Sequence, residues 1–317
     1  MMSRVEVEVD YVNGDVEAGK ELESCGWISG MITVLTFGTS RITGGFITRC
    51  LKKDIGKEAT EILLKDYSPK ELKNILKTLI DAGIGKDITK EYAEKFGKEG
   101  IEWLLSKQEK GLTAEYLRLF IDVDDINLIS DDIIRVVRNS NGIGSDIITY
   151  LNKYGEQAAL NIGKYGDKAV ELYTAVDSVW MDIGKQYSFG NVGVAISEVP
   201  GVERRIKAFS KYNNITGGSN ASGYASERLQ SDRIYETLFV DSNNFINSNR
   251  AFDRSVDTES KILEEIAHEL GHNKFEVDEG TIYLFTERKP CPSCEGVIEK
   301  LKEMFPNIKL YVIYQYN

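Results

Sequence analysis

Two clusters of residues in the last part of the sequence could hold a metal ion. His268-Glu269-Leu270-Gly271-His272 matches H-E-x-x-H, in which zinc peptidases place two histidine ligands and a catalytic glutamate on one helix. Pro290-Cys291-Pro292-Ser293-Cys294 contains C-x-x-C, a spacing that lets two thiolates bind one Zn²⁺. Both clusters predict a zinc site, but only the first, by its pattern, indicates a particular reaction, peptide hydrolysis.

The first cluster fits a peptidase poorly when it is placed on a helix. At about 100° per residue, the apolar side chains from Ile262 to Leu270 form one stripe, and His268 and His272 point away from it. Gly271 favours the end of the helix, which would take His272 off the shared face. The chain has only these two histidines, so the third histidine of the longer peptidase motif is missing. A zinc metallopeptidase using residues 268–272 remains the alternative hypothesis.

The other end of the same helix carries two acidic residues with open interpretations. Glu259 falls within the apolar stripe, where a carboxylate without a partner is costly to bury. Glu259 also lies in the first helical turn, where acids are favoured for structural reasons. Asp257 could be the N-cap of this helix or a metal ligand.

The cysteine pair follows an expected strand and begins an expected helix. Pro292 suits the first turn of a helix, so both sulfurs would lie at a helix N-terminus, where the dipole favours thiolates. Redox use is the rival interpretation of C-x-x-C, but it expects the motif after the first strand of a thioredoxin-like order. Here the motif comes late in the domain.

The elements that would position these residues form an α/β layer domain. Strands are expected over 189–199, 204–213, 237–242, 280–287 and 309–316, and helices over 257–270 and 291–305. Residues 52–180 show helical periodicity instead, with short glycine-containing breaks. We therefore expect a mostly helical region over residues 1–185 and an α/β domain over residues 186–317.

Charge and hydropathy restrict the possible partners. The net charge of −11 is opposite to that of proteins that grip duplex nucleic acid through its phosphates. A basic cluster of Arg204, Arg205, Lys207 and Lys211 is either a solvated strand face or a phosphate-contacting edge. The apolar stretch over 26–47 is interrupted by polar residues and predicts a buried hairpin or helix rather than a stable membrane span. No Sec-type signal peptide is visible at the N-terminus.

The order D-x-E, strand, P-C-x-x-C resembles the zinc deaminases, in which a glutamate moves protons without binding the metal. The resemblance is to the C-terminal deaminase domains of bacterial polymorphic toxins, within the cytidine and nucleic-acid deaminase superfamily. It rests on residues 190–213, on R-x-x-D-T-E-x-K-I-L over 254–263, and on T-E-x-x-P-C-x-x-C over 286–294 with the segment that follows. It says nothing specific about residues 1–180.

The resemblance implies a three-layer cytidine-deaminase-like domain whose mixed sheet carries a zinc site at two helix N-termini. Asp257, Cys291 and Cys294 would bind Zn²⁺, and Glu259 would be the catalytic proton shuttle of a hydrolase that acts on C–N bonds. The superfamily usually has histidine where this chain has Asp257. A carboxylate makes the ligand set one unit more negative, which predicts a weaker Lewis acid.

The implied substrate is cytosine or adenine, in single-stranded nucleic acid, as a flipped base, or in a free nucleotide. Phe209 and Tyr212 are candidates for stacking on a base, with core packing as the common alternative, and Ser293 is a further candidate for substrate contact. A toxin of this kind implies interbacterial competition, delivery to a target cell, action in that cell's cytoplasm and a cognate immunity protein.

Overall fold

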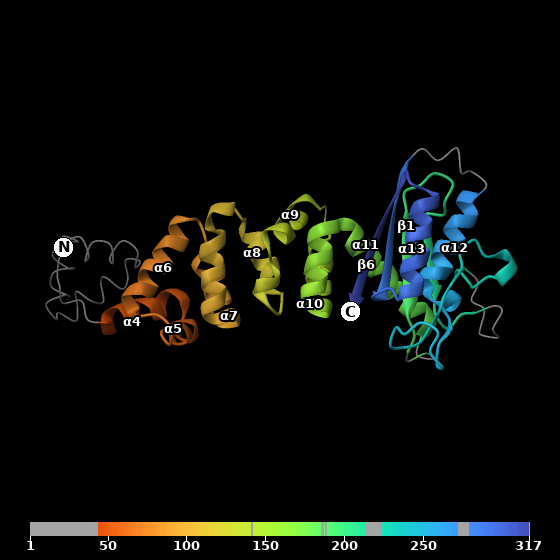
Figure 1. Ribbon diagram of the computed structural model, residues 1–317. Helices are drawn as coiled ribbons and strands as arrows, with labels where there is room; N and C mark the ends of the chain where they lie inside the picture. Colours follow the sequence, from red (N-terminus) through yellow and green to blue (C-terminus); the bar gives the residue numbers. More distant parts are fainter. Residues whose placement is uncertain are drawn as a thin grey trace, which may run out of the picture. The chain divides into compact units, whose positions relative to one another are not determined.

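The structure is a computed structural model, and it describes residues 44–140, 142–184, 187, 189–213, 223–271 and 279–316 (Figure 1). The predicted hairpin or helix over 26–47 lies outside these residues except for 44–47, which begin a helix. The chain divides into two compact units, Met1–Asn127 and Leu128–Asn317. Within the described ranges, no helix combines the length and the apolar character needed to span a bilayer.

In its described residues the first unit is helical, as its periodicity predicted. Its helices are α4 (Gly44–Ile55), α5 (Lys57–Leu63), α6 (Pro69–Asp81), α7 (Lys86–Lys107) and α8 (Ala114–Ile121). The start of helix α6 is fixed by a capping box. The Ser68 hydroxyl accepts a hydrogen bond from the Glu71 backbone N–H, and the Glu71 carboxylate accepts one from the Ser68 N–H. This reciprocal pair satisfies two amides that the helix leaves unbonded.

A lysine–aromatic–glycine triplet breaks helices in both units. Gly97 within α7, and Gly155 and Gly166 in the second unit, all have φ of 58°, which side chains other than glycine rarely adopt. The lysine of each triplet lies over the ring that follows it, at 4.9–5.3 Å from the ring centroid. Each triplet therefore ends one helical segment and starts another, as the glycine-containing breaks in the sequence predicted.

The second unit contains helices α9 (Asp131–Asn139), α10 (Gly144–Tyr165) and α11 (Asp167–Ile183), followed by the α/β domain. Four strands form its main sheet, in the order β2-β1-β5-β6: β1 (Val192–Ser197), β2 (Arg205–Phe209), β5 (Gly280–Arg288) and β6 (Ile308–Tyr316). Strand β1 pairs antiparallel with β2 and β5, and β5 pairs parallel with β6. The sheet is mixed, as predicted.

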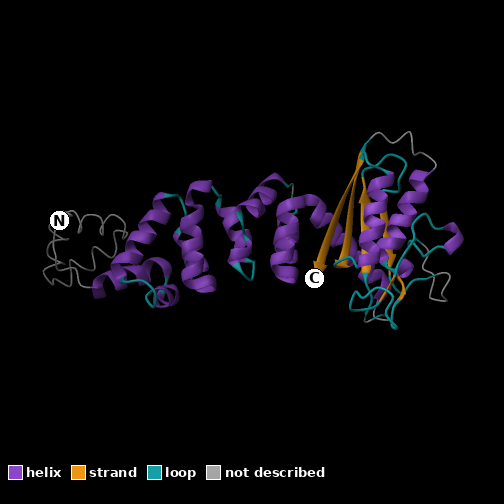
Figure 2. Ribbon diagram, viewed as in Figure 1, coloured by secondary structure: helices purple, strands orange, loops and turns teal. Residues whose placement is uncertain are grey.

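Helices cover both faces of this sheet, which gives the three layers that were predicted (Figure 2). Helices α12 (Thr258–Gly271) and α13 (Pro292–Met304) pack side by side on one face. Their shared core with the sheet includes Ile206, Leu263, Ile266, Leu284 and Leu301, all at most 3% exposed. Helices α11 and α10 contact β1 and β6. The second face is rich in aromatic side chains, such as the Tyr173 and Phe285 rings at 5.3 Å.

The strand predicted over 237–242 does not join the main sheet. Only β3 (Phe239–Val240) is extended there, and it pairs with β4 (Phe252–Asp253) in a separate two-stranded sheet. Strand β4 was not predicted, because two residues carry no periodicity that a sequence can reveal. The resulting hairpin leads directly into α12. The predicted functional division at residues 185 and 186 stays a prediction.

Candidate active site and metal centre

Three candidate metal ligands meet where α12 and α13 begin. The Asp257 Oδ2 atom lies 3.4 Å from each of the sulfurs of Cys291 and Cys294, and the two sulfurs lie 3.5 Å apart. Helix geometry explains the meeting. Asp257 precedes α12 and its carbonyl accepts the first helical hydrogen bond from Lys261, whereas Cys291 is the N-cap of α13. Neighbouring helices that start at the same level bring their first residues together.

These separations fit a tetrahedral Zn²⁺ site. With Zn–S bonds of about 2.3 Å and a Zn–O bond of about 2.1 Å, tetrahedral angles place two sulfurs about 3.8 Å apart and sulfur and oxygen about 3.6 Å apart. Asp257, Cys291 and Cys294 offer three donor atoms, all within 4.8 Å of one another. One coordination position would remain for water, as in catalytic rather than structural zinc sites. The donor set present in the chain therefore fits the metal.

The two cysteines are held close enough to influence each other. Hydrogen bonding from Cys294 lowers the pKa of Cys291 below its usual range. The same pairing and burial raise the pKa of Cys294. A bound cation would favour the thiolate of both.

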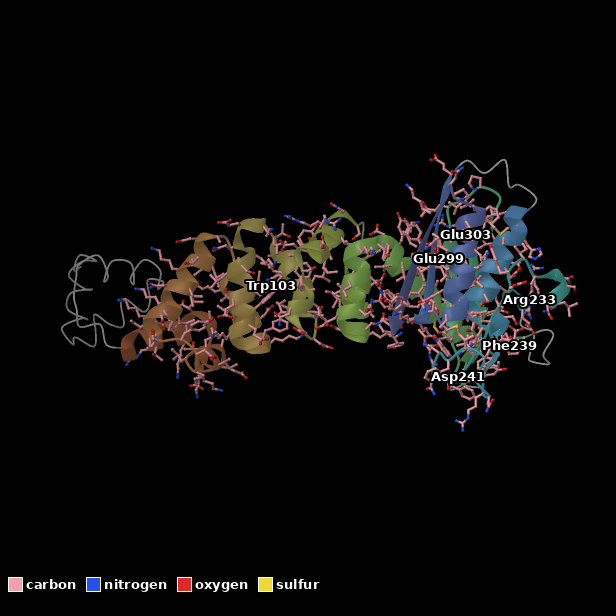
Figure 3. The ribbon with its side chains drawn as sticks, viewed as in Figure 1. Trp103, Arg233, Phe239, Asp241, Glu299 and Glu303 are labelled. Carbon is pink, nitrogen blue, oxygen red and sulfur yellow. The ribbon has the colours of Figure 1, made fainter. Side chains whose placement is uncertain are left out.

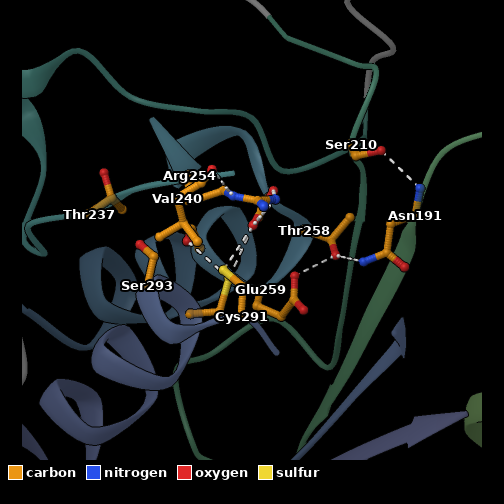
Figure 4. Close-up of polar contacts among 12 residues, drawn as sticks. Asn191, Ser210, Thr237, Val240, Arg254, Thr258, Glu259, Cys291 and Ser293 are labelled. Atoms are coloured by element: carbon orange, nitrogen blue, oxygen red, sulfur yellow. Dashed lines mark hydrogen bonds and ion pairs between the residues drawn. The ribbon is translucent and has the colours of Figure 1, made fainter. Parts of the chain in front are cut away.

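Arg254 places a positive charge against Asp257. Its Nη1 atom lies 3.3 Å from Asp257 Oδ2, and both side chains are mostly buried. The same guanidinium donates from Nε to the carbonyl of Val240 (Figure 4) and from Nη2 to that of Asp241. Arg254 therefore joins the candidate ligand to the β3–β4 hairpin. It also offsets the extra negative charge that a carboxylate brings to this ligand set.

Glu259 lies inside the domain, as its position on the helical wheel predicted. It is 3% exposed, and burial followed by the nearby charge of Asp257 raises its pKa. Both of its carboxylate oxygens accept hydrogen bonds: Oε2 from the Thr258 hydroxyl at 2.9 Å and Oε1 from the Thr286 hydroxyl at 3.0 Å. A carboxylate held at both oxygens has one orientation.

A third residue organises these two hydroxyls. The Nδ2 atom of Asn191 donates to the Thr258 hydroxyl at 2.9 Å (Figure 4) and to the Thr286 hydroxyl at 3.0 Å. Since each hydroxyl accepts from Asn191, its own proton is directed to Glu259. Asn191 precedes β1, Thr258 begins α12 and Thr286 lies on β5. Three elements thus fix one carboxylate.

The predicted substrate contacts lie in packed surroundings. Phe209 is fully buried and Tyr212 is 7% exposed, and their rings meet at 5.0 Å beside Tyr187 and Tyr224. The Ser293 hydroxyl accepts a hydrogen bond from the Leu238 backbone N–H. In this arrangement the rings serve core packing and Ser293 positions the hairpin, while a contact with substrate stays a prediction for all three.

The basic cluster and the histidine motif have other partners. Arg204 and Arg205 pair with Glu171, and Lys207 pairs with Asp182. Three of the four cations of the predicted phosphate edge therefore contact an acid, and Arg204 and Arg205 share one carboxylate. The Nε2 atom of His268 lies 3.0 Å from the carbonyl oxygen of Asp232. His272 lies outside the described residues, so the structure describes only one histidine of that motif.

The comparison with protein families matches residues 182–316 to the toxin-deaminase family described as the BURPS668_1122 family of deaminases. The comparisons with curated proteins and with solved structures give no match. The matched residues contain the mixed sheet, α12, α13 and every candidate site residue named above. The chain therefore carries a deaminase domain of the toxin type over residues 182–316, a hydrolase domain acting on C–N bonds.

Proposed function

We propose that this domain is a zinc-dependent hydrolytic deaminase of a nucleobase, cytosine or adenine, in nucleic acid or a nucleotide. The observation that carries the proposal is the buried carboxylate of Glu259, fixed at both oxygens beside the cluster of Asp257, Cys291 and Cys294. Asp257, Cys291 and Cys294 would hold the zinc. Zn²⁺ bound there supplies a Lewis acid that makes water nucleophilic near neutral pH.

Glu259 supplies the proton transfers of the reaction. Its carboxylate takes a proton from the attacking water and delivers protons to the ring nitrogen and to the departing amino group. A C–O bond forms, the C–N bond to the amino group breaks, and ammonia leaves. The hydroxyls of Thr258 and Thr286 keep the carboxylate aimed while it moves these protons. Burial raises its pKa toward the range in which a group can both accept and release a proton.

The toxin family supports a biological setting for this activity. We infer that the chain acts as an effector delivered to a target cell, in whose cytoplasm nucleic acids or nucleotides are accessible. A cognate immunity protein would protect the producing cell in interbacterial competition. The helical region over residues 1–185 would then serve delivery or link the catalytic domain to the delivery apparatus.

Glu259→Gln tests the mechanism. The variant keeps the shape of the side chain but removes its acid–base function, so deamination should fall by about 10²–10⁴-fold or more. Zinc content, measured by elemental analysis, should stay that of the wild type. Glu265→Gln is the matched control, because Glu265 lies on the same helix and pairs with Arg228. Equal activity of the two variants would contradict the mechanism.

The ligand set is tested separately from the reaction. Asp257→Ala should lose bound zinc, and His268→Ala should keep it. Loss of zinc only in the histidine variant, together with digestion of casein, would favour the metallopeptidase. Sequencing of nucleic acids from cells that express the full chain would reveal C-to-T or A-to-G changes and thereby identify the base.

A further inference from the structure

The β3–β4 hairpin exposes aromatic side chains. Between Leu238 and Asp253, three phenylalanines are open to solvent: Phe239 is 53% exposed, Phe245 is 64% and Phe252 is 45%. Figure 3 shows Phe239 and Asp241 at the end of the domain that carries this hairpin. Exposed rings in one short segment indicate a binding surface, because folding gains nothing from leaving them in water.

The hairpin is tied to the candidate metal centre at two points. The Arg254 guanidinium lies over the Phe252 ring at 4.3 Å and also contacts the Asp257 carboxylate. On the other strand, the Leu238 backbone N–H donates to the Ser293 hydroxyl, between the two cysteines, at 2.8 Å. Phe252 is thus held beside the site, with one side of its ring covered by the cation.

Strand register separates the two phenylalanines of the small sheet. Phe252 pairs with Val240, and Phe239 pairs with Asp253. Paired residues share a face and consecutive residues alternate, so Phe252 and Phe239 lie on opposite faces. Val240 is fully buried, which identifies the face of Phe252 as the one turned toward the domain. Only one of the two rings can border the active site.

The polar groups of the hairpin indicate what it binds. Asp241 accepts three hydrogen bonds from within the hairpin, and Asp253 is paired with Arg233. In the described part of the chain, no carboxylate pairs with Arg250, which is exposed. Four asparagines on this segment are exposed as well: Asn243, Asn244, Asn247 and Asn249. The hairpin therefore offers flat rings and amide groups that suit bases, and an arginine that suits phosphate. Its two acids are already bonded and would not repel a phosphate strongly.

We propose that Phe252 stacks on the base next to the target base of a single-stranded polynucleotide. The inference rests on the proposed function and makes its substrate a polymer rather than a free nucleotide. Stacking supplies affinity without base-specific hydrogen bonds, and single-stranded binders use aromatic side chains in this way. Stacking also explains how a chain with a net charge of −11 could bind nucleic acid without a broad basic groove.

Kinetics of the zinc-loaded full chain test this subsite. Short single-stranded DNA and RNA oligonucleotides with one cytosine or one adenine are compared with the matching free nucleosides. Phe252→Ala should lower kcat/KM for the oligonucleotide about 5- to 150-fold more than for the nucleoside, the loss of one stacked base. Phe252→Tyr should restore the ratio. Phe239→Ala is the matched control on the opposite face, and it should leave the ratio unchanged.

Binding separates this inference from the proposed reaction. The anisotropy of a fluorescent oligonucleotide is measured with Glu259→Gln and with Glu259→Gln/Phe252→Ala. This measurement reports binding and does not require catalysis. Weaker binding of the double variant supports the subsite even where the wild type deaminates nothing. The dependence of log K on log salt should have a slope near −0.7, about one phosphate contact, which Arg250→Gln abolishes.

Two outcomes overturn the inference. If the wild type deaminates both substrates but Phe252→Ala and Phe239→Ala leave the oligonucleotide-to-nucleoside ratio equally unchanged, the reaction stands and the subsite does not. If Phe239→Ala alone weakens oligonucleotide binding, the strand passes the other face of the hairpin.

Discussion

The Oε1 atom of Glu259 lies 3.0 Å from the hydroxyl of Thr286, although 27 residues separate the two in the sequence. Glu259 is in the first turn of α12, and Thr286 is on the neighbouring strand β5, just before the loop to the cysteines. The strand that leads to the candidate metal ligands therefore also holds the candidate proton shuttle. Strand β5 thus connects the position of the Glu259 carboxylate to that of the two cysteines.

Thr286→Val should lower kcat while zinc stays bound. Valine has nearly the shape of threonine but cannot donate, so the Glu259 carboxylate loses the hydrogen bond at one oxygen and its fixed orientation. A hydrogen bond to a charged group contributes about 1.5–3 kcal/mol, which corresponds to a fall of about 10- to 150-fold in kcat. Steady-state kinetics and zinc analysis measure the two effects.

The effect should depend on the hydroxyl and not on the strand. Thr286→Ser keeps a donor and should recover most of the activity. Thr281→Val makes the same chemical change on the same strand, away from Glu259, and should resemble the wild type. Equal kcat in Thr286→Val and Thr281→Val would show that this hydroxyl does not position the carboxylate.

The charge of Arg254 should set how well the site accepts a histidine ligand. In the wild type, the Arg254 cation offsets the Asp257 carboxylate at 3.3 Å. Asp257→His removes the anion and leaves the Arg254 cation facing the metal, so zinc affinity should fall. We expect a loss of about 10–100-fold, the usual effect when the contact between a metal ligand and its neighbour is disturbed. Asp257→His/Arg254→Gln removes both charges and should regain affinity.

Competition with a chelator at fixed pH measures these affinities. Thermal unfolding of each variant provides the control, because Arg254 also binds the carbonyls of Val240 and Asp241. Weaker zinc binding in the folded double variant than in Asp257→His would mean that Arg254 does not act through charge. The expectation of a weaker Lewis acid considered only the charges of the three ligands. The Arg254 cation beside Asp257 offsets one of these negative charges.

The sequence was most informative where chemistry depends on local spacing. Asp257, Glu259 and the two cysteines stand at fixed distances from helix starts, so their position could be predicted before any contact was known. Thr258, Thr286 and Arg254 were also within the motifs that carried the resemblance, but the sequence assigned them no function. Their roles arise from contacts between separate elements, which periodicity does not report.

Asn191 and the β3–β4 hairpin could not be predicted for the same reason. Asn191 lies within the segment 190–213 that carried the resemblance, but it is 67 residues from Thr258 and 95 from Thr286, and the sequence assigned it no role. The hairpin strands are two residues long and depend on Arg254 and Ser293 for their position. The arrangement of the α/β layers was predictable because each main element buries a long apolar stripe.

Gly193→Ala should destabilise the domain and disturb the site. A Cβ at Gly193 on β1 would lie 2.9 Å from the Thr258 Cβ and 3.0 Å from the Ile262 Cδ1, both on α12. The helix would have to move away from the sheet, at a cost of about 1–3 kcal/mol for overpacking. Thr258 would move with it, so kcat should fall together with stability.

Gly296→Ala is the matched control for this substitution. Gly296 is exposed on α13, and a Cβ there meets no atom within 4 Å. Alanine in a helix should stabilise by about 0.5–1 kcal/mol, without an effect on kcat. Chemical denaturation of both variants gives the free energies of unfolding. A Gly193→Ala variant as stable as the wild type would contradict the close packing of β1 against α12.

Lys261 should make stability rise with pH. Its Nζ atom donates to the carbonyls of Phe209 and Tyr212 at 3.0 and 2.9 Å, and the residue is 1% exposed. Burial lowers its pKa from 10.5 to about 8. Between these values the unfolded chain holds a proton that the folded chain has lost, so raising the pH favours the folded state.

The measurement is a difference between two proteins. Lys261→Met removes the titrating group, and other groups, including the thiols, cancel when its free energy of unfolding is subtracted from that of the wild type. From pH 8 to pH 9.5 this difference should shift in favour of the wild type by about 1.5 kcal/mol, because the slope grows from about half to nearly all of 1.4 kcal/mol for each pH unit. Below pH 8 the difference should level off, because lysine is then protonated in both states. A difference that stays flat from pH 8 to 9.5 would mean that Lys261 keeps its usual pKa and that its two hydrogen bonds compensate fully for burial.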